Sequence, residues 1–306
     1  MRLRYEKKDL GLSFAIAVAM MIVASLLLGL VFGADATGWK FWLMQALYTL
    51  IIGGSALVYA AISKTNLLTA TTMNKAPRYA HVLWGALGVT FLIACMTPIN
   101  NLLLDGIEAL GLKRPSVNLE KNLAGLLIVA CLLPAVCEEL VFRGTVAQSL
   151  ANSNKVGALA ISGALFALFH ASAAQTVHQF VLGAFLTLLA LRSGSLWTSV
   201  IVHLYNNVLV VVLSYTPLDA KEFWSFSTNT AVVVPILVVG VVGFGLSVFG
   251  YIKATKSVWQ DTSNTVECSS EAKTKSNLNV ASLIALIVAI AICVTLWVSN
   301  LLQYEV

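Results

Sequence analysis

Three short segments carry polar side chains into stretches that are otherwise apolar enough to lie in a membrane. They contain Glu138, Glu139 and Arg143, then Phe166 and His170, and finally His203 and Asn207. An ionisable group inside a bilayer costs several kcal/mol on most scales, so it usually marks a functional site. Five such groups within one third of the chain predict a reaction centre.

The two glutamates should have different tasks. Because Glu138 and Glu139 are consecutive, their side chains point about 100° apart on a helix. Arg143 lies four residues after Glu139 and therefore on its face, where an ion pair would hold the arginine in the apolar interior. Glu138 is then the carboxylate without a local cation, and it suits a general base. The alternative is that both glutamates only solvate the end of their helix.

Two hydrogen-bond donors lie on a later helix. His203 and Asn207 are four residues apart, so they stack on one face and can both donate to one small group, as a tetrahedral oxyanion requires. His170 closes the apolar segment 161–169, and by itself it would be interpreted as a packing residue with a local hydrogen bond. These three residues and Glu138 agree in depth, at roughly 11–20 Å from the cytoplasmic ends of their helices.

The composition is that of a polytopic membrane protein. Of the 306 residues, 58% are hydrophobic and 11% charged, and the mean hydropathy is +0.86, which excludes an ordinary soluble domain. Each membrane span needs about 20 apolar residues. Candidate spans lie at about 11–32, 41–63, 81–104, 123–148, 157–172, 176–191, 196–214, 230–252 and 279–301. We therefore expect an all-α transmembrane bundle of eight or nine spans, with the active site in a cavity of the central helices.

The distribution of Lys and Arg predicts the orientation. With a cytoplasmic N-terminus, fourteen of these residues fall inside and five outside, a bias typical of that topology. The net charge of +5 follows from this bias and requires no nucleic-acid partner. The first apolar run, of about 21 residues, is too long for a signal peptide and should be retained. We expect a multi-pass protein of a bacterial plasma membrane, with lipids and a membrane-bound protein or peptide as partners.

The chain divides by polarity into five regions. We expect scaffold helices over 1–122, a catalytic core over 123–215, an eighth span over 216–252, a cytoplasmic loop over 253–279 and an accessory helix over 280–306. The loop is rich in Ser, Thr, Lys and Glu and has no apolar period. The pair Gly53–Gly54 and the Gly-rich stretch 240–250 indicate close helix packing.

The sequence lacks the residues that several known mechanisms of intramembrane hydrolysis require. No His is followed by Glu, so the H-E-x-x-H zinc motif is missing. Ser195 starts a helix and is too shallow to reach His170, while Asp105 and Asp219 lie in loops and cannot form an aspartyl dyad. Cys137 has no cation of its own to activate a thiolate. A water activated by glutamate, with His and Asn helpers, remains.

The three motifs, E-E-x-x-x-R at 138–143, F-x-x-x-H at 166–170 and H-x-x-x-N at 203–207, resemble those of the CPBP family. This family comprises intramembrane glutamic endopeptidases, including type II CAAX prenyl proteases and Abi-like, bacteriocin-processing relatives. The resemblance covers about 120–215. It implies an intramembrane endopeptidase that acts on a membrane-associated or lipid-modified protein or peptide.

The resemblance also implies a role for each residue. Glu138 would deprotonate a water, His170 would orient that water, and His203 with Asn207 would stabilise the oxyanion. Glu139, Arg143 and Phe166 would support these side chains, and no cofactor or metal would be needed.

Three other functions fit the same residues. Two His and a carboxylate could hold zinc in a metal-dependent variant of the hydrolase. A non-catalytic immunity or assembly protein could bind a peptide in the same cavity. An ion-coupled transporter could use Glu138 and His170 as a proton relay, although no internal repeat is visible.

Overall fold

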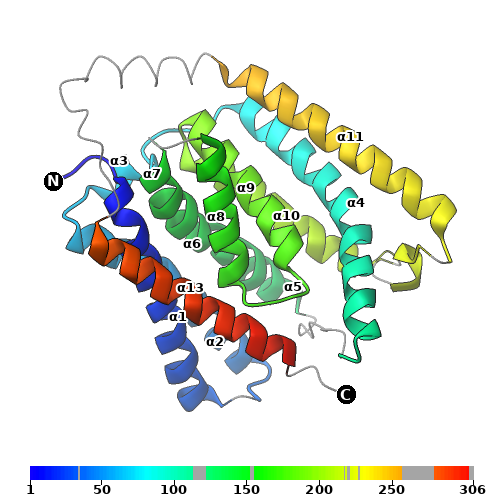
Figure 1. The fold of residues 1–306 in the computed structure, drawn as a ribbon, viewed down its shortest axis with the longest axis horizontal. Coiled ribbons are helices and arrows are strands. Elements are labelled where there is room, and N and C mark those ends of the chain that lie inside the picture. Colours follow the sequence, from blue (N-terminus) through cyan, green and yellow to red (C-terminus); the bar gives the residue numbers. More distant parts are fainter. Residues whose placement is uncertain are drawn as a thin grey trace.

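The computed structural model describes residues 1–33, 35–112, 122–151, 155–216, 218, 221–226, 228–256 and 279–302. Within these residues the protein is a helical bundle without a β-strand, which confirms the predicted fold class (Figure 1). The long helices are α1 (Leu10–Phe32), α2 (Trp39–Ile62), α4 (Tyr79–Ala109), α8 (Lys155–Phe169), α9 (Thr176–Ser193), α10 (Leu196–Ser214), α11 (Thr230–Ala254) and α13 (Val280–Leu302). Shorter helices are α3 (Leu67–Ala70), α5 (Leu123–Gly125), α6 (Leu133–Val141) and α7 (Ala147–Leu150).

The helices match the predicted apolar segments. Within the described residues, eight helical segments are long and apolar enough to cross a membrane, and the 15-residue α8 is a shorter apolar helix. The chain is thus an integral, multi-pass membrane protein. The predicted loop 253–279 lies largely outside the described residues, since α11 continues to Ala254 and residues 257–278 are not described.

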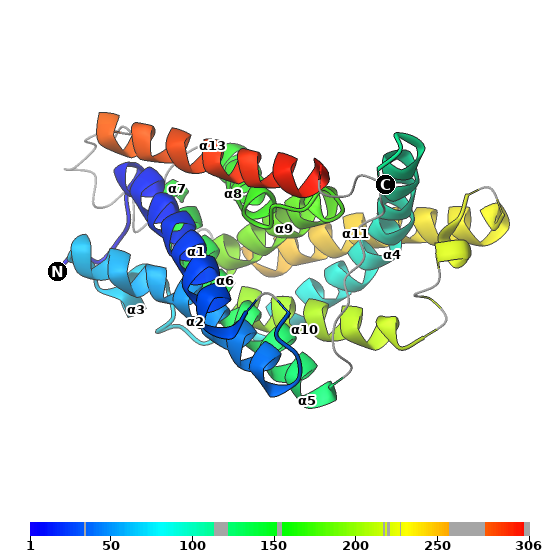
Figure 2. The ribbon, with the colours of Figure 1, turned by 90° about the horizontal axis from the view of Figure 1, so that it is seen from below.

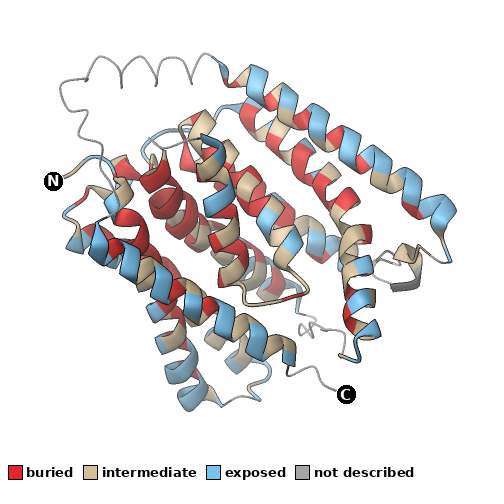
Figure 3. Ribbon diagram, viewed as in Figure 1, coloured by how far each residue is buried: buried red, intermediate tan, exposed pale blue. Residues whose placement is uncertain are grey.

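The central helices are flanked on two sides. Helices α6, α8, α9 and α10 lie in the middle, with α1, α2 and α13 on one side and α4 with α11 on the other (Figures 1 and 2). Buried residues concentrate in the central helices, while α11 and α13 present exposed faces (Figure 3). These faces are apolar, for example Val238 and Leu246 on α11, as a surface in contact with lipid requires.

The segment that carries the glutamates contains two stretches of wider helical pitch. The helix Leu123–Leu150 contains two π-helical stretches, Leu126–Leu132 and Phe142–Val146, on either side of α6. Pro134 lies in the first turn of α6 and has no N–H to donate, which favours a wider turn before it. Short π-helical stretches are frequent at functional sites. Apolar periodicity did not reveal them.

Glycine permits two of the close helix contacts that position the core. A Cβ at Gly53 of α2 would lie 2.7 Å from the Cβ of Cys137, next to the glutamates, and one at Gly240 of α11 would lie 2.6 Å from the Cys95 nitrogen of α4. The predicted close packing at both sites is confirmed. A Cβ at Gly54, by contrast, would meet only the tip of the Met20 side chain within 4 Å among the described residues.

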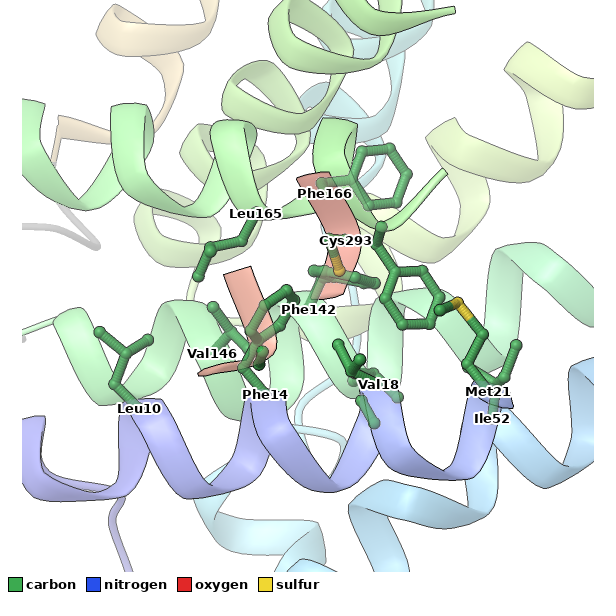
Figure 4. Packing of buried hydrophobic residues seen from close by; sticks show 14 of the residues in the cluster. Leu10, Phe14, Val18, Met21, Ile52, Phe142, Val146, Leu165, Phe166 and Cys293 are labelled. Atoms are coloured by element: carbon green, nitrogen blue, oxygen red, sulfur yellow. The ribbon is translucent and has the colours of Figure 1, made fainter. Parts of the chain in front are cut away.

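The largest apolar cluster joins both ends of the chain to the central helices. Phe14 and Val18 of α1 pack with Phe142, Phe166 and Cys293, the last from α13 (Figure 4). Because Phe14 meets Phe142 edge-on at 6.4 Å, α1 directly supports the helix that carries the glutamates.

Candidate active site

Glu139 and Arg143 form a fully buried ion pair, as their spacing predicted. Arg143 Nη1 donates to Glu139 Oε1 at 2.7 Å, and both side chains are 0% exposed. The guanidinium also donates from Nη2 to the Gly183 carbonyl at 3.0 Å and lies 4.3 Å above the Phe166 ring. Arginine suits this environment because its planar group can serve three partners at once.

A close crossing of α8 and α9 gives Arg143 its backbone partner. A Cβ at Gly163 would come within 2.7 Å of the Phe180 carbonyl oxygen, and one at Gly183 would come within 3.0 Å of Phe166. The two helices can therefore approach closely enough for Arg143 to reach a carbonyl on α9. Sequence spacing alone could not identify this carbonyl.

Glu138 faces two histidines from two other helical segments. Its Oε2 lies 3.9 Å from Nε2 of His170 and 3.9 Å from Nε2 of His203. The side chains of Glu138 and His170 remain 19% and 18% exposed, whereas those of Glu139 and Arg143 are fully buried. Glu138 Oε2 has no hydrogen-bond partner among the described residues. Glu138, His170 and His203, one from each of the three motifs, therefore converge.

Both imidazole rings are oriented through Nδ1. In His170, Nδ1 lies 2.8 Å from the Phe166 carbonyl oxygen, and in His203 it lies 2.9 Å from Glu139 Oε1. Both of these oxygens are acceptors, so each Nδ1 carries a proton. In a neutral ring, the Nε2 that faces Glu138 is then unprotonated and can accept a hydrogen bond.

Phe166 is the common neighbour of the charged groups. Its buried ring lies 4.6 Å from the His170 ring, 6.1 Å from the His203 ring and 5.0 Å from Phe142, all edge-on. Together with Arg143 on its face, the ring excludes water behind the histidines and fixes their spacing.

Asn207 lies one turn after His203 on α10 and contacts the first π-helical stretch. Its Nδ2 donates to the Cys131 carbonyl at 3.4 Å, and its Oδ1 accepts from Asn206 Nδ2 at 3.0 Å. The neighbouring asparagine thereby determines which side of the Asn207 amide presents its N–H groups.

Two contributors were missed by the motif analysis. Ser199 is buried one turn before His203 on α10 and interacts with Glu139, and the spacing of four that joins it to His203 could have revealed it. Tyr48 of α2 interacts electrostatically with Glu138, and nothing in its local sequence indicates that.

Among the described residues, no three His, Cys, Asp or Glu side chains are grouped so that they could hold a metal ion.

Comparison with known proteins identifies the central segment. Residues 120–209 match the family model described as type II CAAX prenyl endopeptidase, Rce1-like. Neither the curated proteins nor the solved structures contain a significant match. The matched segment holds all three motifs and every side chain of the convergent cluster. This segment is thus similar to the Rce1-like family of type II CAAX prenyl endopeptidases.

Proposed function

We propose that the protein is a glutamate-dependent intramembrane endopeptidase in which Glu138 activates the attacking water. The observation that carries this proposal is the position of Glu138 Oε2, 3.9 Å from Nε2 of both His170 and His203. One water can hydrogen-bond to a carboxylate and an imidazole at that separation. The similarity of residues 120–209 to this family supports proteolysis, and the convergence of these side chains supports the glutamate mechanism.

The proton positions assign different tasks to Glu138 and His170. The lone pair on His170 Nε2 accepts a hydrogen bond from one O–H of the water and so orients the water. Glu138 takes the proton of the other O–H while the water oxygen forms a bond to the scissile carbonyl carbon. When the carbon–nitrogen bond breaks, the protonated Glu138 gives its proton to the leaving amine.

His203 and Asn207 stabilise the oxyanion. Because Glu139 fixes the proton on His203 Nδ1, His203 can donate from Nε2 only as an imidazolium. The Asn207 amide supplies the second donor.

The substrate is a membrane-bound or lipid-modified protein or peptide, and it is cut from the cytoplasmic side of a bacterial plasma membrane. The family name makes a prenylated peptide with a C-terminal CAAX sequence the first substrate to test. Abi-like or bacteriocin-processing roles provide further peptide substrates. No metal or nucleic acid takes part.

The test compares the wild type with Glu138→Gln in two assays. The first measures cleavage of a farnesylated CAAX peptide in proteoliposomes. The second compares the protein termini in membranes of cells that carry either chain. General-base catalysis predicts a loss of about 10²–10⁴-fold in kcat. The matched control is Cys137→Ala, which changes the adjacent residue and should retain activity. Full activity in Glu138→Gln would refute the mechanism, and identical termini with an intact cellular phenotype would favour a peptide-binding role. Inactivation by a chelator and recovery with zinc would establish the metal-dependent variant.

A further inference from the structure

The C-terminal helix α13 holds the turn that follows His170. We infer that Asn300 and Trp297 of α13 are positioning residues for His170, an inference that rests on the proposed function. Helix α13 lies outside the segment 120–209 that matches the family. The helix crosses α1 and ends beside the turn between α8 and α9 (Figures 1 and 2).

The turn needs support because α8 is short. With 15 residues, α8 extends only about 22 Å, less than the roughly 30 Å of a bilayer core, so the turn lies at membrane depth. Irregular backbone at that depth persists only where protein groups satisfy its hydrogen bonds. Ala171, directly after His170, also has a φ of +47°, which a residue with a side chain rarely adopts. Such a conformation requires neighbours that maintain it.

Helix α13 supplies these partners at both ends of the turn. Asn300 Nδ2 donates to the Ala171 carbonyl at 2.8 Å, and Trp297 Nε1 donates to Thr176 Oγ1 at 2.8 Å. Thr176 Oγ1 in turn donates to the Ser172 carbonyl at 2.7 Å. Trp297 also packs with the apolar cluster that contains Ala173.

The position of Ala171 determines that of the His170 ring. His170 is fixed on one side by the hydrogen bond from Nδ1 to Phe166 and on the other by its peptide bond to Ala171. If Asn300 released the Ala171 carbonyl, the backbone could relax and shift Nε2 away from Glu138. Misplacement of a reacting group by about 1 Å can cost about a hundredfold in rate.

Helix α13 is itself firmly docked. A Cβ at Gly11 of α1 would lie 1.7 Å from the Ser282 carbonyl oxygen, and the Gly11 N–H donates to Ser282 Oγ at 3.0 Å. Further along α13, Cys293 is fully buried in the cluster that contains Phe142 and Phe169. The helix is therefore positioned by α1 and can hold the turn in a defined place.

The test measures kcat and KM separately for Asn300→Ala and Trp297→Phe, the second of which keeps an aromatic ring and removes only the N–H donor. We expect kcat to fall about tenfold to a hundredfold, with KM within about twofold of the wild-type value because substrate contacts are unchanged. The matched control is Ser299→Ala, an exposed position on the same helix that should leave both constants unchanged.

A double variant distinguishes positioning from general stabilisation. In single turnovers with excess His170→Ala enzyme, adding Asn300→Ala should have no further effect if Asn300 acts through His170. An equal loss in both backgrounds would overturn the inference. So would a wild-type kcat in both Asn300→Ala and Trp297→Phe while Glu138→Gln is inactive. Activity in Glu138→Gln would instead refute the proposed function itself.

Discussion

At the scale of single residues, one carboxylate oxygen connects the structural and the reactive halves of the site. Glu139 Oε1 accepts from both Arg143 and His203, at 2.7 and 2.9 Å. Glu138, its neighbour in sequence, has ion-pair partners in the described part of the chain only at 3.9 Å. Consecutive residues of the same type thus differ in role because a helix directs them to different neighbours.

This difference predicts opposite outcomes for two matched substitutions. Glu139→Gln leaves the Arg143 guanidinium buried without its counter-ion, which should lower the free energy of unfolding by about 3–5 kcal/mol. Glu138→Gln removes no close ion pair, so stability should stay near that of the wild type, while kcat falls by about 10²–10⁴-fold. Denaturant unfolding of both variants in the same detergent checks this. Equal stability of the two variants would show that the Glu139–Arg143 ion pair does not contribute to the free energy of unfolding.

At the scale of elements, the distance between α2 and α6 depends on one glycine. Gly53→Ala would place a methyl group 2.7 Å from Cys137 Cβ and 3.2 Å from its Cα, so the α6 backbone must move. Overpacking of this kind costs about 1–3 kcal/mol and should shift Glu138, so that activity falls more than stability. Gly54→Ala is the matched control, since its methyl group would meet only the flexible end of Met20 in the described part of the chain.

The measurement for this pair is activity together with thermal unfolding in one detergent. We expect Gly53→Ala to lower both quantities and Gly54→Ala to leave both near the wild-type values. If the two variants behave alike, the contact at Gly53 does not determine the position of α6.

Much of this arrangement could be predicted from the sequence, and the remainder follows from long-range contacts. Apolar run length predicted the helices because a bilayer requires about 20 apolar residues, and spacing by four predicted the Glu139–Arg143 pair. Apolar periodicity did not reveal the π-helical stretches. The Gly183 carbonyl was not predictable as a partner of Arg143, since that contact arises from packing between helices. The bond from Asn300 to Ala171 joins residues 129 positions apart, and no local pattern encodes it.

At the scale of the whole molecule, contacts at the helix ends agree with the alternation that the charges predict. Each of three contacts joins two segments that the Lys and Arg count assigns to the cytoplasm. They are Arg2 N to Lys64 O at 2.8 Å, Ser195 Oγ to Lys75 O at 2.6 Å, and Arg192 Nε to Thr255 Oγ1 at 2.9 Å. The packing thus determines which ends share a face, and the positive charge determines which face is cytoplasmic.

The orientation leads to a prediction about two exposed lysines, one at the start of α2 and one after α3. Lys40 lies in the first turn of α2 and Lys75 lies beyond its end, and both are exposed. We expect Lys40→Cys to react with a membrane-impermeant maleimide in intact cells, and Lys75→Cys to react only after permeabilisation. The wild-type chain, labelled in parallel, corrects for its native cysteines. The reverse pattern would place the N-terminus and the cytoplasmic ends of these helices outside, and the enzyme would then have to draw its substrate from the opposite face of the membrane.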